Sequence, residues 1–211
     1  MSHASLAIEL VVVFLLPPLA LRLGWIGAPP IPLLLAFAAG AYWLVRRDRG
    51  FPWAALSVWP ARGFRPVLLR TALLCLLIGL GVWWLAPARL FNFVRTKPWL
   101  WAAVMILYPL VSVYPQEFLY RAFFFHRYRP LFRYDRSLVL ASALVFGFVH
   151  IIFGNWLSVG LTAVGGVLFG ITYRQTGSLL AAAVEHALLG NFVFTIGLGE
   201  FFYHGSRMAQ G

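Results

Sequence analysis

Seven long apolar segments follow one another along this chain, and short loops rich in arginine separate them. They lie at about 6–24, 30–46, 66–86, 98–126, 137–153, 156–173 and 178–198. A helix needs about 20 mainly apolar residues to cross a membrane, where its backbone polar groups must be satisfied internally. Of the 211 residues, 62% are hydrophobic and 11% are charged, against about 25% charged in a soluble domain. The sequence therefore predicts an all-α fold, a polytopic membrane helix bundle of about seven transmembrane helices.

The predicted segments leave no room for a sizeable soluble domain, so we expect one membrane domain with three parts. These are N-terminal transmembrane helices with a basic interfacial loop at 1–97, a helical core at 98–198, and a short tail at 199–211. The apolar run at 51–60 is too short to cross a membrane. Because it contains Trp53 and Trp59, we expect it to lie at the level of the lipid headgroups.

The basic residues are distributed unevenly among the loops. The loops after the second, fourth and sixth segments carry about twice as many arginines as the remaining loops carry basic residues. This bias predicts an integral membrane protein with a cytoplasmic N-terminus. The formal charge of the chain is +11, and we expect the basic loops to face the cytoplasm and anionic lipid. No basic stripe with spaced aromatic residues lies outside the segments, so we expect no nucleic-acid partner. Almost exclusive use of arginine hints at a GC-rich bacterial genome, and hence at a bacterial inner membrane.

Five polar residues inside the segments are candidates for function, because such residues are costly in a bilayer. They are Glu117, Arg121, His150, His186 and Asn191. At 1.5 Å per helical residue, Glu117 lies about 15 Å from the predicted cytoplasmic end of its segment, and His150 about 20 Å. The same arithmetic places His186 at about 12 Å and Asn191 at about 20 Å. Three different segments thus bring these residues to similar depths, which predicts a polar site in an intramembrane cavity.

Each residue also has a structural interpretation. Glu117 and Arg121 are four residues apart, which is the spacing of an ion pair on one helix. A single histidine or asparagine in a membrane more often bonds to a neighbouring helix than takes part in catalysis. Glu185 points about 100° away from its neighbour His186, so we expect it to pair with Arg70 or Arg174, or to face water.

Taken together, these residues can activate water and stabilise an oxyanion. Glu117 would take a proton from water as a general base, assisted by one histidine. The other histidine and the amide of Asn191 would donate hydrogen bonds to the oxyanion. Alternatively, Glu117, His150 and His186 could bind zinc as a His₂Glu set with an open position for water. The residue types alone leave both routes open.

Three motifs resemble those of the CAAX prenyl protease and bacteriocin-processing (CPBP, Abi) family of intramembrane endopeptidases. QEFLYR at 116–121 is similar to the family's EExxxR, FGFVH at 146–150 to its FxxxH, and HALLGN at 186–191 to its histidine followed by an asparagine. The resemblance covers about residues 98–198 and implies a helical bundle with an intramembrane cavity.

The resemblance also implies an activity, the hydrolysis of a peptide bond in a membrane-embedded protein or peptide. We predict that Glu117 and His150 activate water, that His186 and Asn191 support the oxyanion, and that Arg121 orients Glu117. The family pattern favours a route without a cofactor, with zinc as the alternative.

Two departures from the family pattern stand out. Gln116 replaces the first glutamate, to which the family owes water activation, although Pro115 is expected to reset the local helix. Asn191 follows His186 by five residues rather than four, and Gly190 takes the usual position of the asparagine. A π-bulge would bring Asn191 back to the face of His186. The departures keep open a catalytically impaired scaffold or binding protein on the same fold, and a small transporter is a third reading.

Overall fold

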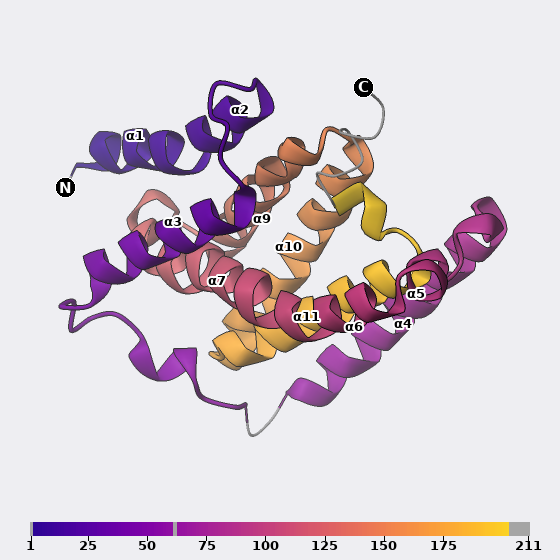
Figure 1. The fold of residues 1–211 in the computed structure, drawn as a ribbon. Helices are drawn as coiled ribbons and strands as arrows, with labels where there is room; N and C mark the ends of the chain where they lie inside the picture. Colours follow the sequence, from indigo (N-terminus) through magenta and orange to yellow (C-terminus); the bar gives the residue numbers. More distant parts are fainter. Residues whose placement is uncertain (1, 61–62, 203–211) are drawn as a thin grey trace.

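The computed structural model describes residues 2–60 and 63–202, which form helices joined by short loops, with no strand among them (Figure 1). The longer helices are α1 (His3–Phe14), α2 (Leu16–Arg22), α3 (Pro30–Val45), α4 (Phe64–Leu85), α6 (Pro98–Tyr108), α9 (Asp135–Val149), α10 (Trp156–Thr176) and α11 (Leu179–Ile196). The short helices are α5 (Asn92–Thr96), α7 (Tyr114–Glu117) and α8 (Phe124–Arg127). The all-α prediction is confirmed, and most of the expected tail at 199–211 lies outside the described residues.

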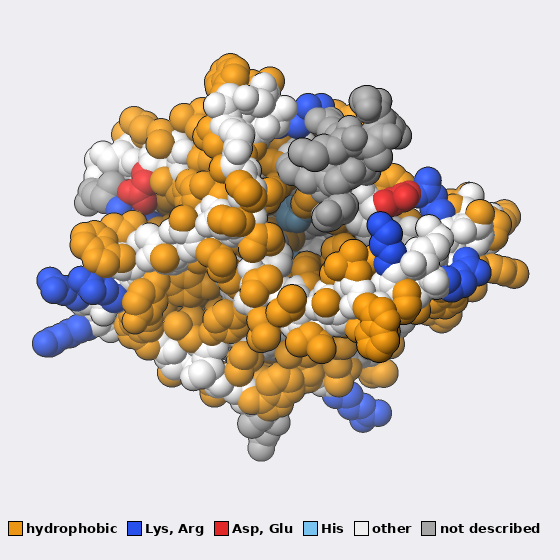
Figure 2. Space-filling model, in the orientation of Figure 1, with side chains coloured by type: hydrophobic (Ala, Val, Ile, Leu, Met, Phe, Trp, Pro, Cys, Tyr) orange, Lys and Arg blue, Asp and Glu red, His pale blue; other side chains and the backbone are white. Residues whose placement is uncertain are grey.

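Six helical segments of the described chain are long and apolar enough to cross a membrane. They are His3–Arg22, Phe64–Leu85, Pro98–Arg127, Asp135–Phe153, Trp156–Thr176 and Leu179–Ile196. The seventh predicted segment is α3, whose 16 residues extend over about 24 Å, less than the roughly 30 Å of a hydrocarbon core. Hydrophobic side chains cover most of the visible face, and basic side chains, nearly all of them arginines, gather at its margins (Figure 2). The chain is an integral membrane protein.

The loops after the second, fourth and sixth predicted segments lie at one end of the bundle. Asp48 Oδ2 is 2.7 Å from His126 Nε2, which joins the loop after α3 to the end of α8. The hydroxyl of Ser178 donates to the carbonyl of Val58 at 2.6 Å, which adds the loop after α10. These contacts agree with the arginine distribution, whereas the cytoplasmic location of this end stays a prediction.

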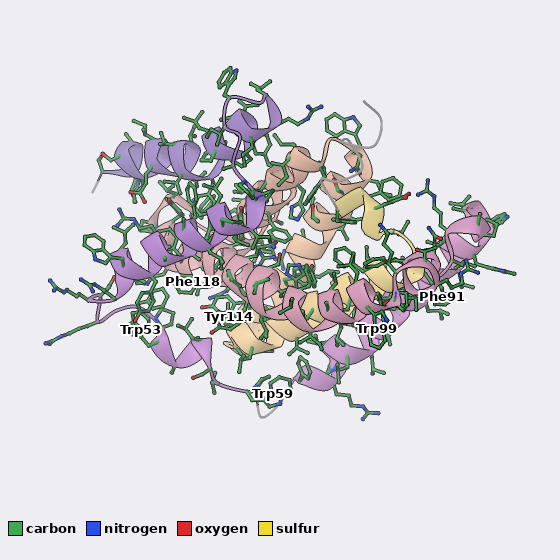
Figure 3. The ribbon with its side chains drawn as sticks, in the orientation of Figure 1. Trp53, Trp59, Phe91, Trp99, Tyr114 and Phe118 are labelled. Carbon is green, nitrogen blue, oxygen red and sulfur yellow. The ribbon has the colours of Figure 1, made fainter. Side chains whose placement is uncertain are left out.

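The apolar run at 51–60 does not cross the bundle but packs along its arginine-rich end. Figure 3 shows Trp53 and Trp59 on the segment that links α3 to α4. The ring of Phe51 lies 4.6 Å from that of Trp53 and 6.1 Å from that of Phe118, between centroids. Trp59 is half exposed and packs on Phe64. The segment therefore covers the base of the helix that contains Glu117.

The helix at Pro98–Arg127 is not regular. It widens to π-helical geometry at Pro109–Val113 and again at Phe118–Phe123, on both sides of α7. A π turn rotates the residues that follow it relative to an α-helix, and such turns are frequent at functional sites. The hydroxyl of Ser142 on α9 donates to the carbonyl of Tyr120 at 2.6 Å, which satisfies a backbone group in the second π segment.

Helices α9 and α10 pack closely because glycines lie at their contact. A Cβ added at Gly166 would lie 2.9 Å from the Cα of Ala143, and one at Gly147 would lie 2.7 Å from the Cβ of Ala163. Small residues allow such close approach between membrane helices. The contact brings the aromatic residues of both helices, Phe146 and Phe169, against the polar residues described below.

We expect Gly166→Ala to destabilise the protein by about 1–3 kcal/mol, because the added methyl group overpacks the contact with α9. The free energy of unfolding in mixed detergent micelles measures this loss. Gly160→Ala on the same helix is the matched control, since an added Cβ there has no neighbour within 4 Å. Equal stability of the two variants would contradict close packing at Gly166.

Candidate active site

A buried carboxylate, that of Glu117, joins two helices at the centre of the bundle. Its side chain is 0% exposed. Oε1 accepts a hydrogen bond from Nδ1 of His186 on α11 at 2.8 Å, because a carboxylate can only accept from the ring. Oε2 lies 3.1 Å from Nε of Arg121, which is also fully buried. The ion pair expected from the spacing of Glu117 and Arg121 is present, and it includes His186.

The guanidinium of Arg121 is enclosed by aromatic rings and backbone. Its Cζ lies 4.7 Å from the ring centre of Phe146 and 5.6 Å from that of Phe169. Nη2 donates to the carbonyl of Gly166 at 3.3 Å. Contacts of a cation with ring faces stabilise it most when water is excluded. Arg121 is therefore a fixed counter-charge for Glu117 inside the bundle.

A cavity of about 550 Å³ lies beside this ion pair, between α4, α6, α10 and α11. Most of its lining is aliphatic or aromatic. The polar lining residues are Tyr108, Ser112, Gln116, His150, Thr162 and His186. As far as the described residues define the cavity, Glu117, Arg121 and Asn191 lie outside its lining. The five candidate residues thus divide between the cavity wall and the interior behind it.

His150 lies on the cavity wall, in the turn that follows α9. Its Nδ1 donates to the carbonyl of Phe146 at 2.7 Å. This hydrogen bond selects the tautomer in which Nε2 of the neutral ring carries the lone pair. The ring of Phe146 packs edge-on against both histidines, with centroid distances of 4.9 Å to His150 and 5.5 Å to His186. The two imidazoles therefore flank one phenyl ring.

His186 connects the buried ion pair to the cavity. Its Nδ1 faces Glu117, and its Nε2 lies 3.1 Å from the hydroxyl of Tyr108. The imidazole stacks on Phe169, with 4.5 Å between centroids and 12° between planes. Hydrogen bonds on both nitrogens and a stacked ring fix the orientation of His186. A continuous row runs from Arg121 through Glu117 and His186 to Tyr108 at the wall.

Gln116 lies on the cavity wall, whereas Glu117 points into the interior, as the 100° between helical neighbours requires. The Gln116 Nε2 donates to the hydroxyl of Ser112 at 2.7 Å. Its Oε1 is buried and has no hydrogen-bond partner among the described residues. An unpaired buried acceptor is costly, and this oxygen must turn toward the cavity before a water molecule or a substrate N–H can satisfy it.

Asn191 does not join the cavity, because α11 is a regular α-helix and contains no π-bulge. Its Nδ2 donates instead to the carbonyl of Met105 on α6 at 3.2 Å. Gly190 occupies the wall, and a Cβ added there would lie 2.4 Å from the hydroxyl oxygen of Tyr108. The sequence reasoning missed Tyr108, since a tyrosine in an apolar run is usually a packing residue. The sequence signal that could have pointed to Tyr108 was Gly190, the glycine four residues after His186.

Glu185, the neighbour of His186, belongs to a separate network. It is fully buried and accepts hydrogen bonds from Arg70 Nε at 3.1 Å and from the Thr172 hydroxyl at 2.6 Å. Arg70 was one of its two expected partners. This network joins α4, α10 and α11, and Glu185 lies outside the lining of the cavity as the described residues define it.

The proposed zinc ligands do not fit a metal site. Within residues 2–60 and 63–202, no three His, Cys, Asp or Glu side chains are grouped to hold a metal ion. The oxygens of Glu117 face Arg121 and His186, and Nδ1 of His150 is bonded to backbone. Nε2 of each histidine could still bind a metal, but a His₂Glu set would require Glu117 to leave its contacts with Arg121 and His186.

The fold and the site define a polytopic membrane protein with two histidines on the wall of an apolar cavity. Residues 97–193 match the family model described as type II CAAX prenyl endopeptidase Rce1-like. The match covers slightly less than half of the chain and includes all three motifs. No curated protein and no solved structure matched the chain. Over residues 97–193 the chain is similar to this family of CAAX prenyl endopeptidases, and the resemblance stated from the motifs is confirmed.

We expect Arg121→Met to lower stability by about 3–5 kcal/mol, because it removes the arginine that pairs with the buried carboxylate of Glu117. The double variant Glu117→Leu/Arg121→Met removes both charges and should be more stable than Arg121→Met alone. Unfolding free energies of the four proteins in a double-mutant cycle measure the coupling. A double variant whose loss equals or exceeds the sum of the single losses would rule out a stabilising pair.

Proposed function

We propose that the protein is an intramembrane endopeptidase that hydrolyses a peptide bond of a membrane-associated protein or peptide in this cavity. The observation that carries the proposal is that two residues lining one cavity offer acceptors, Nε2 of His150 and Oε1 of Gln116, which has no hydrogen-bond partner among the described residues. A water molecule has two hydrogens and can donate one to each acceptor. The mainly apolar lining suits a substrate that enters from the lipid phase.

In the proposed reaction His150 is the general base. Its Nε2 takes a proton from the water while the water oxygen attacks the carbonyl carbon, whose π electrons move to the carbonyl oxygen. The C–N bond then breaks as the protonated His150 returns the proton to the departing amine. The products are a carboxylic acid and an amine. Gln116 orients the water but takes no proton, because an amide is not a base.

Glu117 and Arg121 have supporting roles in this proposal. The sequence favoured Glu117 as a base, but both of its oxygens are directed at neighbouring side chains and away from the cavity. We propose that Glu117 holds the ring of His186, and that Arg121 fixes Glu117. His186 then supports the developing oxyanion from the cavity wall, where polar groups act strongly because the cavity is poor in water. We propose for Asn191 a role in packing α11 on α6.

We expect His150→Ala to lower kcat/KM by about 10²–10⁴-fold, because the variant has no general base. The assay uses purified protein in lipid nanodiscs and a quenched fluorescent peptide with a farnesylated C-terminal CAAX sequence. An unprenylated peptide of the same sequence tests whether the lipid is needed. His126→Ala is the matched control, since this histidine pairs with Asp48 at the bundle end. Full activity of folded His150→Ala protein would refute the proposed base.

A scaffold without activity is the alternative, and Gln116 is the residue that favours it. If wild-type protein cleaves neither peptide and Gln116→Glu protein does, the chain is an impaired member of the family. If wild-type protein is active, we expect Gln116→Ala to be slower because the water loses one of its two acceptors.

We further propose that hydrolysis needs no metal ion. Prolonged dialysis against EDTA and 1,10-phenanthroline should leave the cleavage rate within about twofold, because His150 supplies the base that a metal-bound hydroxide would replace. A rate that falls more than tenfold and returns on addition of zinc would contradict the metal-free route.

A further inference from the structure

We infer that Tyr108 is a catalytic residue that donates a hydrogen bond to the oxyanion, in the place where the family has an asparagine. The inference rests on the proposed function, because it concerns the same cavity and reaction. Tyr108 lies at the end of α6, directly before the first π segment, and its hydroxyl reaches Nε2 of His186 at 3.1 Å. It also lines the cavity.

The first argument is spatial. Residues four apart lie on the same face of a helix, so position 190 projects beside His186. A Cβ at Gly190 would lie 2.4 Å from Oη, 2.5 Å from Cε1 and 2.8 Å from Cζ of Tyr108. Real atoms do not approach so closely, so Tyr108 in this position and a side chain at 190 exclude each other. The phenol fills the space that an asparagine four residues after His186 would take.

The second argument concerns hydrogens. A phenol has one hydrogen, and a protonated His186 has two N–H groups. Glu117 accepts one of these, and Nε2–H donates to the oxygen of Tyr108. The phenol hydrogen is then free for the cavity. As the electron pair of the carbonyl moves to its oxygen, Tyr108 donates to that oxygen and keeps its proton.

The third argument is rigidity, since an oxyanion donor must be in place before charge develops. The ring of Tyr108 packs edge-on against Phe194, 5.3 Å between centroids. Asn191 binds the carbonyl of Met105, one turn before Tyr108 on α6. Trp101 Nε1 donates to the hydroxyl of Thr195 at 3.0 Å, one turn further along α11. Asn191, although outside the cavity lining, thus holds the turn that presents Tyr108.

The experiment compares Tyr108→Phe with wild type in nanodiscs, using the CAAX peptides above and a phosphinate analogue of the farnesylated peptide. We expect kcat to fall by about 10²–10³-fold and KM to change by less than about threefold. Affinity for the phosphinate should fall with kcat, whereas affinity for the uncleaved peptide should not. Tyr114→Phe is the control, because the Tyr114 hydroxyl donates to the carbonyl of Leu56 and lies outside the cavity lining.

A rescue variant separates chemistry from packing. Tyr108→Ala should be as slow as Tyr108→Phe, and Tyr108→Ala/Gly190→Asn should regain at least tenfold in kcat, because the asparagine amide can then donate. Gly190→Asn alone should lose activity, since Tyr108 blocks the new side chain. Thermal unfolding of each variant shows whether it is folded. A folded double variant whose kcat does not rise would contradict the claim that Tyr108 takes the place of the asparagine.

The outcomes distinguish failure of this inference from failure of the proposed function. Wild-type cleavage with an unchanged rate in Tyr108→Phe overturns the role of Tyr108 and leaves the protease intact. No wild-type cleavage, together with phosphinate binding that depends on Tyr108, overturns the protease and supports the donor. No cleavage and no phosphinate binding by wild type overturn both.

Discussion

The carboxylate of Glu117 is the interaction on which the site depends. An ionised group in a membrane bundle persists only if partners compensate for its lost hydration. Here Arg121 and His186 contact its two oxygens, and the aromatic rings of α9 and α10 enclose the guanidinium. The same contacts fix the imidazole of His186, so one buried ion pair sets the geometry of a residue at the cavity wall. The buried ion pair is thereby separated from the polar residues that line the cavity.

The geometry of the helix that contains Glu117 separates the buried ion pair from the cavity. Two π segments flank the single turn of α7, so Gln116 faces the cavity and its neighbour faces the interior. The close contact of α9 with α10 then brings Phe146 between the two histidines. A mainly apolar cavity beside such a row excludes much of the water that would weaken its hydrogen bonds. Backbone irregularity, glycine contacts and one ion pair together produce the arrangement.

Much of this was accessible from the sequence. Hydropathy identified all seven apolar helices, although α3 is shorter than a full span, and depth arithmetic brought Glu117, His150 and His186 to one level. The depth of a residue in the membrane does not show which way its side chain points around the helix axis. A π turn changes that direction without any change in the amino-acid composition of the segment. This is why the sequence favoured Glu117 over Gln116 as a residue of the cavity. The sequence did not point to Tyr108, because the evidence for its position is the missing side chain at Gly190. A glycine there becomes informative only once the structure places α6 beside α11.

A structure of the protein with the farnesylated phosphinate bound would test the central claim most directly. The claim is that Glu117 holds His186 from behind while the reaction takes place at the wall. We predict one phosphinate oxygen within hydrogen-bond distance of the Tyr108 hydroxyl and the other beside Nε2 of His150, with Glu117 still bonded to His186. A phosphinate that contacts Glu117 directly, or a metal ion between the two, would contradict it.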